Sequence, residues 1–589
     1  MIYRIKLFIL LVAVTACSTV QEPGNNKFIY CENGRLYHPN GEEVSLWGVN
    51  LQPCLSWEYY YYIKKTGFIP KDPEVWKRMV DNSLDELETL NCQVIRCHLT
   101  PADFTDAGGN ITETFYLDML DYMISEAGKR GIYLYFAFLN HMSFGEVENT
   151  FLSMAPEWGD RPKWIVDEEF IVHTKNYIEQ LLERINPYTG TAYKNEPMVA
   201  VWELINEPLY YSFDAFKETP YYNDFEKWLN GQNLKENESN YKSYRKQLVL
   251  DYIDGMYDVV RKTGAKQPVV WSCNWHKMMQ GRKDVFEAIS ESKVEVVSFC
   301  NYPGQDVCKH PYLENPEDLT RHDFSEWFKN CYNIEEWYGW MLTDAFKDKA
   351  KVVYEFETFY NQSAYLYPAQ AKLFRALGAQ IATMWHYAMP DYAPFVNGSH
   401  FLNLKCTPRK AASFAVAGSI FNHLPLYGLY GPDATTEDLK NNYMFSYKKD
   451  LSIYANEEKY FHSGSVSGEE EPKPHPGTKQ IIGYGNSPLV EYDGSGVYRL
   501  DISEDQINIS IEPDSKWLRE PWQRDLLKYR VTELDSSAVH IMTLQIRGWN
   551  SDNCRVFELH PDGEKKMAFI GGELRFKVTP GKYKIRKNE

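Results

Sequence analysis

Residues 198–208 have the sequence MVAVWELINEP, in which most side chains are apolar until the chain reaches Asn206, Glu207 and Pro208. A strand with one face in water would alternate apolar and polar residues, so this run predicts a strand buried on both faces. Glu207 then falls where the strand meets its following loop. A buried carboxyl group is costly, so an acid at the end of a core strand indicates a functional role.

Seven further apolar runs are separated by stretches of helical pattern. They are 44–50, 94–98, 132–139, 268–273, 294–300, 352–356 and 380–386. Asp72 followed by Pro73 is a typical helix start, and Gly131 ends a second helical stretch. Alternating strands and helices predict an α/β fold, a (β/α)8 TIM barrel over residues 28–424. A doubly wound sheet is the alternative, but no glycine-rich phosphate loop follows the first strand.

Residues 425–589 have a different pattern. Apolar and polar residues alternate in short segments divided by Asp-Gly and Pro-Gly turns, and residues 465–480 have the composition of a loop. The alternating segments are 497–502, 507–511, 539–546 and 574–585. This pattern predicts a C-terminal antiparallel β-domain of the sandwich type, whose function is packing or glycan binding.

The N-terminus has the pattern of an export signal. Arg4 and Lys6 precede an apolar run that ends at Ala16, next to Cys17. Residues 14–17 resemble a bacterial lipobox, so we expect a signal peptide over 1–16, lipidation of Cys17 and a tether over 17–27. The protein would then be secreted and held on a bacterial membrane by its lipid. An ordinary cleaved signal with an incidental cysteine is the alternative.

The composition excludes some partners. The 589 residues carry a formal net charge of −18, which repels phosphate backbones and argues against nucleic acid. The cysteines show no CxxC pair or zinc-finger spacing, so most are interpreted as buried thiols, with one or two disulfides that the sequence cannot assign. We expect no metal and no organic cofactor.

A second acid, Glu355, follows the residues Val352, Val353 and Tyr354. Active sites in such barrels lie at the carboxyl ends of the strands, so Glu355 and Glu207 would reach the same opening. Two carboxyl groups placed in this way can hydrolyse a glycoside, one as an acid and the other as a nucleophile or stabilising charge. Glu357 is an alternative to Glu355, because alternation along a strand puts both side chains on the same side. Glu357 lies farther from the apolar run than Glu355, and this favours Glu355.

Two other acids are given structural roles. Glu203 lies deeper in the strand than Glu207 and is expected to partner a buried arginine. The motif at 195–197 is a second Asn-Glu-Pro, but it precedes the apolar strand and would lie at the opposite end of the barrel from Glu207.

With these positions the chain resembles the clan of β-glycosidases with catalytic acids on strands four and seven, and within it glycoside hydrolase family 5, the cellulase–mannanase family. The resemblance covers roughly residues 40–390 and implies a retaining mechanism with Glu207 as acid/base and Glu355 as nucleophile. It also implies supporting roles at five further residues, which are Arg96 beside the nucleophile, His141 on the substrate, Asn206 on the sugar 2-hydroxyl, Tyr302 on the nucleophile and Trp385 as a stacking platform.

One position departs from the family pattern. The family usually has His-x-Tyr after strand six, where this chain has Cys300-Asn301-Tyr302. A sister family such as the β-1,3-glucanase family 157 therefore remains an alternative. The expected substrate is a β-glucan (β-1,3 or β-1,4) or a β-mannan.

Aromatic residues in the loops after the strands could line a cleft with several sugar subsites, which favours cleavage within a polymer (endo-action). Cleavage from the chain ends (exo-action) is the alternative. The partner would be a poly- or oligosaccharide, bound by a monomer. A non-catalytic glycan-binding lipoprotein is one rival hypothesis. The other is a metal-dependent barrel hydrolase, which would need ligands among His98, His141 and His386.

Overall fold

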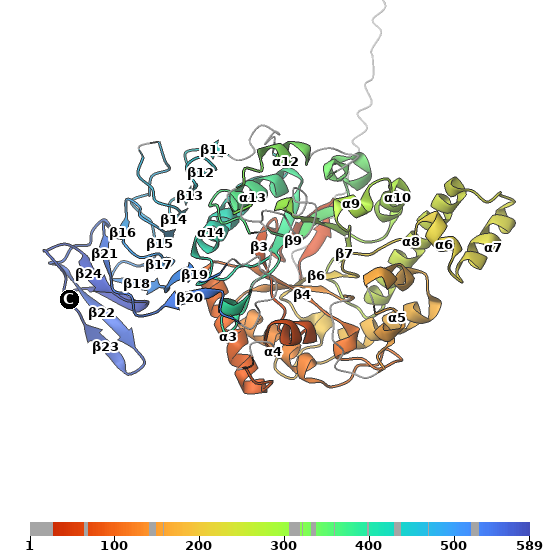
Figure 1. Ribbon diagram of the computed structural model, residues 1–589, viewed down its shortest axis with the longest axis horizontal. Coiled ribbons are helices and arrows are strands. Elements are labelled where there is room, and N and C mark those ends of the chain that lie inside the picture. Colours follow the sequence, from red (N-terminus) through yellow and green to blue (C-terminus); the bar gives the residue numbers. More distant parts are fainter. Residues whose placement is uncertain are drawn as a thin grey trace, which may run out of the picture.

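The structure is a computed structural model that describes residues 27–588 except 64–66, 68, 141–148, 157, 305–318, 321, 332–336, 358–359, 397–399, 429–436, 469 and 520–528. Its centre is a closed barrel of parallel strands (Figure 1). The barrel closes because β10 pairs with both β9 and β3. The barrel strands are β3 (Leu46–Asn50), β4 (Val94–His98), β5 (Tyr133–Ala137), β6 (Val199–Glu203), β7 (Val269–Ser272), β8 (Val296–Asn301), β9 (Ala350–Phe356) and β10 (Ala379–Met384).

Each of the apolar runs identified in the sequence supplies one barrel strand, so the predicted fold is confirmed. Every residue of β3, β4, β6, β7, β8, β9 and β10 is buried. The burial follows from the architecture, because one face of each strand lines the barrel interior and the other is covered by helices. The barrel is closed, which excludes the doubly wound sheet.

Helices follow the strands around the outside of the barrel (Figure 1). The main ones are α3 (Pro73–Thr89), α4 (Phe115–Lys129), α5 (Glu168–Glu183), α8 (Glu238–Lys262), α10 (Lys283–Glu291), α12 (Ser325–Asn330), α13 (Leu366–Ala376) and α14 (Pro408–His423). α3 begins as predicted, since the Asp72 side chain accepts hydrogen bonds from the amides of Glu74 and Val75. The other helices are α1 (Ser56–Glu58), α6 (Phe213–Lys217), α7 (Tyr222–Gln232) and α9 (His276–Met279).

The last helix of the barrel joins it to the C-terminal region. α14 contacts β3 on one side and β13, β14 and β15 on the other, and it is buried from Lys410 to Phe421. Gly418 makes this close packing possible, because a Cβ atom there would lie 2.7 Å from the Trp47 ring. The barrel and the C-terminal sheet therefore share one hydrophobic core.

The C-terminal region consists mainly of two sheets. The strands of the ten-stranded sheet, in spatial order, are β11 (Glu437–Leu439), β12 (Tyr443–Ser446), β13 (Leu451–Ala455), β14 (Lys459–Ser463), β15 (Gln480–Tyr484), β17 (Tyr498–Ile502), β18 (Gln506–Ile511), β25 (Gly581–Lys587), β22 (Cys554–His560) and β23 (Gly563–Lys566). The three-stranded sheet contains β16 (Val490–Tyr492), β21 (His540–Leu544) and β24 (Arg575–Val578). Side chains from both sheets form one core, as expected for a sandwich.

The predicted antiparallel pairing holds with one exception. β14 pairs in parallel with β15, and the chain between them includes most of the predicted loop at 465–480. A parallel neighbour needs a long connection to return the chain to the same end of the sheet, which this loop provides. Small two-stranded sheets complete the fold, made by β1 (Tyr30–Glu32) with β2 (Arg35–Tyr37), and by β19 (Asp514–Trp517) with β20 (Thr532–Asp535).

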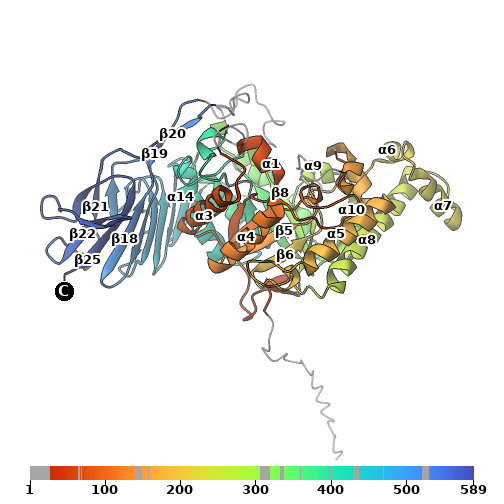
Figure 2. The same cartoon turned by 90° about the horizontal axis from the view of Figure 1, so that it is seen from below.

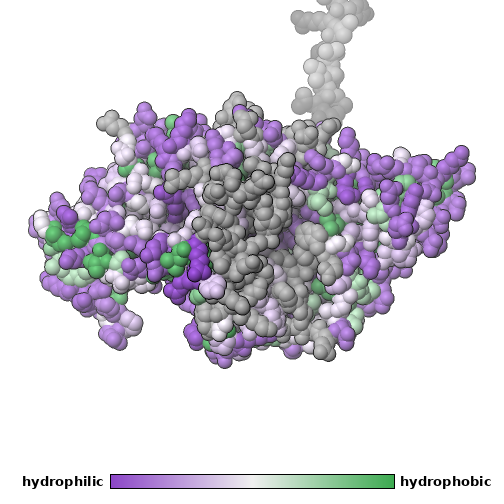
Figure 3. Space-filling model, in the orientation of Figure 1, coloured by the Kyte–Doolittle hydropathy of each residue, from purple (hydrophilic) through white to green (hydrophobic). Residues whose placement is uncertain are grey.

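The molecule is elongated, with the C-terminal sheets at one end, the barrel in the middle and α6 and α7 at the other end (Figures 1 and 2). The described surface in Figure 3 is mostly hydrophilic. None of the helices within the described ranges is long and apolar enough to span a bilayer. The cysteines that the structure describes are free thiols, and all but Cys31 are buried.

Candidate active site

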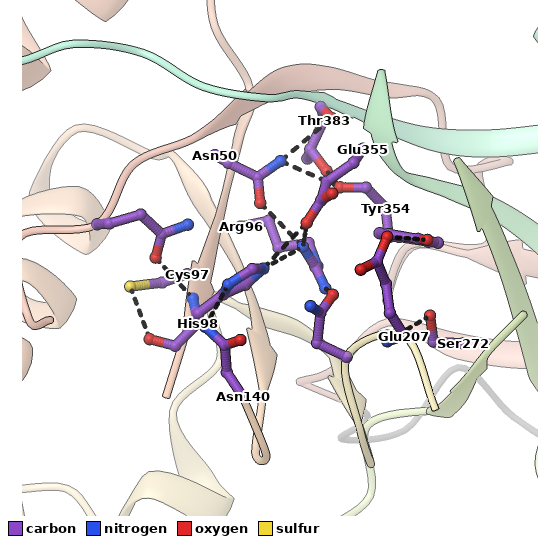
Figure 4. Close-up of polar contacts among 12 residues, drawn as sticks. Asn50, Arg96, Cys97, His98, Asn140, Glu207, Ser272, Tyr354, Glu355 and Thr383 are labelled. Carbon is purple, nitrogen blue, oxygen red and sulfur yellow. Dashed lines mark hydrogen bonds and ion pairs between the residues drawn. The ribbon is translucent and has the colours of Figure 1, made fainter. Parts of the chain in front are cut away.

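The carboxyl ends of β6 and β9 bring the two predicted acids to one opening of the barrel. Glu207 follows β6, and Glu355 is the second-last residue of β9 (Figure 4). They are close enough that the charge of Glu355 raises the pKa of Glu207. The structure therefore brings together the two carboxyl groups that the sequence placed at the same end of the barrel.

A β-bulge in β9 directs Glu355 to the opening. Val353 pairs with Phe299 of β8, but the next pair joins Glu355 to Cys300, so β9 has one extra residue at this point. The register against β10 shifts at the same place. A bulge changes which residues face each side of a strand. Tyr354 and Glu355 consequently both contact residues of the site, which regular alternation would not allow.

Glu355 is held by three buried side chains. Arg96 Nη1 donates a hydrogen bond to its Oε1 at 2.9 Å, and Tyr302 donates its hydroxyl to Oε2 at 2.7 Å. His98 Nε2 lies 3.1 Å from Oε1. Burial raises the pKa of Glu355 above its ordinary value, and Arg96 and Tyr302 limit this rise by stabilising the ionised form. Two donors that favour the carboxylate suit a nucleophile.

Arg96 is the centre of a buried hydrogen-bond network. Its Nε and Nη2 donate to both oxygens of Glu203, at 3.1 and 2.8 Å, as expected for the structural acid of β6. Nη2 also donates to Asn206 Oδ1 at 2.9 Å, and Nη1 to Asn50 Oδ1 at 3.0 Å. The planar guanidinium therefore fixes Asn206 and Glu355 relative to each other.

Glu207 has a different environment. Its Oε1 accepts a hydrogen bond from the Tyr354 hydroxyl at 3.0 Å, and Arg161 Nη1 lies 3.8 Å from its Oε2 (Figure 4 shows the Tyr354 contact). Burial, together with the charge of Glu355, raises the pKa of Glu207 to about 7. A carboxyl group with this pKa is protonated in a large fraction of molecules near neutral pH, as a general acid requires.

Glu357 is bound by side chains of the surrounding helices. It is fully buried and forms a 2.5 Å ion pair with Lys410 of α14, and it accepts a hydrogen bond from the Tyr367 hydroxyl of α13 at 3.0 Å. Burial opposes its ionisation, but Lys410 and His400 outweigh that effect and lower the pKa of Glu357. Glu357 thus joins the barrel to its helices. The geometry favours Glu355 over Glu357 as the second carboxyl group of the site, beside Glu207.

The remaining predicted residues are placed as follows. Trp385 directly follows β10, and its ring stacks on His98 with centroids 4.9 Å apart. Glu196 precedes β6, at the opposite end of that strand from Glu207, and accepts a hydrogen bond from Thr189. His141 and Cys17 lie outside the described residues.

Three residues of the site were not identified from the sequence, namely Asn50, Arg161 and Tyr354, and His98 was considered only as a metal ligand. His98 stands two residues after Arg96 on the same strand, so alternation could have placed both side chains on one face. Burial, followed by the charge of Arg96, lowers the pKa of His98 well below its usual value, so His98 is neutral. Arg161 lies in a 3-10 helix, Trp158–Ile165, whose proximity to Glu207 no sequence pattern indicates.

Two of the loop aromatics are packing residues. Trp164 is buried and stacks on Phe170, and the buried Tyr387 donates a hydrogen bond to Glu86. Trp57 and Trp275 are partly exposed. Within the described ranges, no group of three or more His, Cys, Asp or Glu side chains is arranged to hold a metal ion.

No protein-family model matches the chain. Among curated proteins, mannan endo-1,4-beta-mannosidase 4 of Solanum lycopersicum is 28% identical over 194 residues, covering 31% of this chain and 44% of the relative. Mannan endo-1,4-beta-mannosidase 4 of Oryza sativa subsp. japonica is 33% identical over 99 residues, covering 16% and 21%. The chain resembles endo-1,4-β-mannosidases. It spans less than half the length of these curated relatives.

Among solved structures, the endo-1,4-beta-mannanase from Rhizomucor miehei aligns with a TM-score of 0.45 and 15% identity, over 67% of this chain and 100% of that chain. The sequence similarity to mannosidases supports the resemblance to clan A, family 5-like glycoside hydrolases found in the motifs.

Proposed function

We propose that the protein is a retaining β-glycoside hydrolase that cleaves a β-1,4-linked mannan internally. The observation that carries this proposal is the arrangement of Glu207 and Glu355 at one barrel opening, each with partners that suit a different role. The similarity to endo-1,4-β-mannosidases supports mannan over the other β-glycans.

The reaction follows from the two environments. Glu207, protonated, donates its proton to the oxygen of the leaving sugar while the Glu355 carboxylate attacks the anomeric carbon. The product of this step is a glycosyl-enzyme joined through a Glu355 oxygen. Glu207, now ionised, removes a proton from water, and the water attacks the same carbon and releases Glu355. Arg96 and Tyr302 hold Glu355 in position through both steps.

Digestion of a substrate panel tests the proposal. The full chain is incubated with β-1,4-mannan, β-1,4-glucan and β-1,3-glucan, and the products are sized over time. Early release of mixed oligosaccharides from mannan is expected, whereas release of a single short sugar would indicate exo-action. Preference for β-1,3-glucan would support the sister family. Binding of a glycan without cleavage of any would support the non-catalytic alternative.

The two Asn-Glu-Pro motifs provide a matched control. Glu207→Gln should reduce cleavage of mannan strongly, because an amide cannot donate the proton, and should keep some activity on aryl glycosides, whose good leaving groups need no acid in the first step. Glu196→Gln makes the same chemical change at the other end of β6 and should leave cleavage near wild type. Equal losses in both variants would contradict the assignment of Glu207.

A further inference from the structure

The turn that carries Glu207 has an unusual backbone. Glu207 has φ of +47°, in the left-handed region that residues other than glycine rarely adopt. Such a conformation persists only where the surroundings hold it, and it often occurs at functional sites. Here it determines the direction in which the Glu207 carboxyl group leaves the strand.

Side chains from two other segments hold this turn. Arg161 Nη1 donates a hydrogen bond to the Glu207 carbonyl oxygen at 2.5 Å. Asn274, which follows β7, donates its Nδ2 to the carbonyl oxygens of Glu207 at 3.1 Å and of Pro208 at 3.0 Å. The Glu207 amide donates to Ser272 Oγ at 3.4 Å. The conformation of the turn therefore depends on contacts from outside its own strand.

Arg161 differs from Asn274 because it also brings a charge. Its side chain is fully buried, and its Nη1 lies 3.8 Å from Glu207 Oε2. A buried guanidinium is costly unless nearby groups compensate for the lost hydration. The Glu207 carboxyl group lies within ion-pair distance of this guanidinium and is one of the groups that compensate it.

Among the residues that the structure describes, other charged and titratable groups that act on Glu207 come from three strands or their ends. Glu355 and Tyr354 lie on β9, Arg96 on β4, and Tyr302 at the end of β8. The positive charge of Arg96 is already paired with Glu203 and Glu355. Arg161 is accordingly the cation with the greater effect on Glu207.

We propose that Arg161 is a positioning residue for the acid/base: one guanidinium holds the left-handed turn at Glu207 and places a fixed positive charge beside its carboxyl group. The inference rests on the proposed function and deepens it. The charge opposes the effects of burial and of Glu355, so Glu207 can lose its proton in the first step and remain an effective base in the second.

Three variants separate the two contributions of Arg161. Arg161→Gln keeps an amide donor but removes the charge, Arg161→Lys keeps the charge, and Asn274→Ala removes turn contacts without changing any charge. Each is assayed on the unactivated glycan across pH, with the unfolding transition measured as a check on folding. Glu207 must be protonated to act as the acid, so its pKa sets the upper limb of the kcat/KM profile.

Arg161→Gln should move this limb to higher pH by about one unit, because loss of a nearby positive charge raises a carboxyl pKa. Arg161→Lys and Asn274→Ala should lower kcat/KM while leaving the limb in place. A folded Arg161→Gln variant with the wild-type limb would overturn the proposal. If Arg161→Gln does not fold, the Asn274→Ala variant provides the test. A shift of the upper limb of its pH profile would also overturn the proposal, because this variant changes no charge. Failure of the proposed function is distinguishable, because either the wild-type protein would then cleave no glycan or Glu207→Gln would retain full activity.

Discussion

Glu357→Ala should destabilise the fold without removing the nucleophile. Glu357 is 0% and Lys410 is 2% exposed, and their charged atoms are 2.5 Å apart. Truncation of one member of such a pair leaves the other charge buried and unpaired, which costs about 3–5 kcal/mol. Lys410 also donates to the Phe401 carbonyl at 3.0 Å, but a neutral acceptor cannot offset a full charge. The expected loss therefore lies within this range.

Urea denaturation followed by tryptophan fluorescence measures this loss, and activity is measured below the transition. The double variant Glu357→Leu with Lys410→Met is the control, because replacing a buried ion pair by apolar residues is often neutral or stabilising. It should recover most of the lost stability. A Glu357→Ala variant as stable as wild type would refute this account of the pair. An inactive variant rescued by azide would make Glu357 the nucleophile instead of Glu355.

Four further outcomes are expected. Glu355→Ala should abolish turnover, and azide should restore it with formation of the α-glycosyl azide; unchanged turnover would exclude Glu355 as nucleophile. Wild-type kcat/KM should fall above about pH 7, since the pKa of Glu207 is raised to about 7 and its protonated form is required; a profile flat to pH 9 or so would contradict this. His98→Ala removes a ring that lies 3.1 Å from Glu355 and 2.7 Å from Arg96, and because a small displacement of the nucleophile is costly, kcat/KM should fall roughly 10- to 100-fold; wild-type kinetics would show that His98 has no positioning role. Cys17→Ser should move the protein from the membrane fraction to the soluble fraction, because the proposed lipid anchor cannot form; continued membrane association would refute that anchor.

The sequence alone determined the barrel and one of its two acids. Strands buried on both faces must be apolar at nearly every position, so each barrel strand was visible as a short run. The end of such a run marks the carboxyl end of its strand, which placed Glu207 at the opening and Glu196 at the other end. The start of α3 could be predicted for a similar reason, because the Asp72 side chain satisfies amides only a few residues away. These features depend on local pattern.

Only the tertiary structure decided between Glu355 and Glu357. Alternation treats the two residues as equivalent, but the bulge at Tyr354 and Glu355 is defined by register against β8 and β10. Glu357 pairs with Lys410, which lies far along the chain on α14. Tyr354, which lies on the bulge of β9, donates a hydrogen bond to Glu207. Likewise Arg161 reaches Glu207 from a separate loop. A pairing register and a buried charge contact each depend on where a distant segment lies, and no local pattern of residues specifies that.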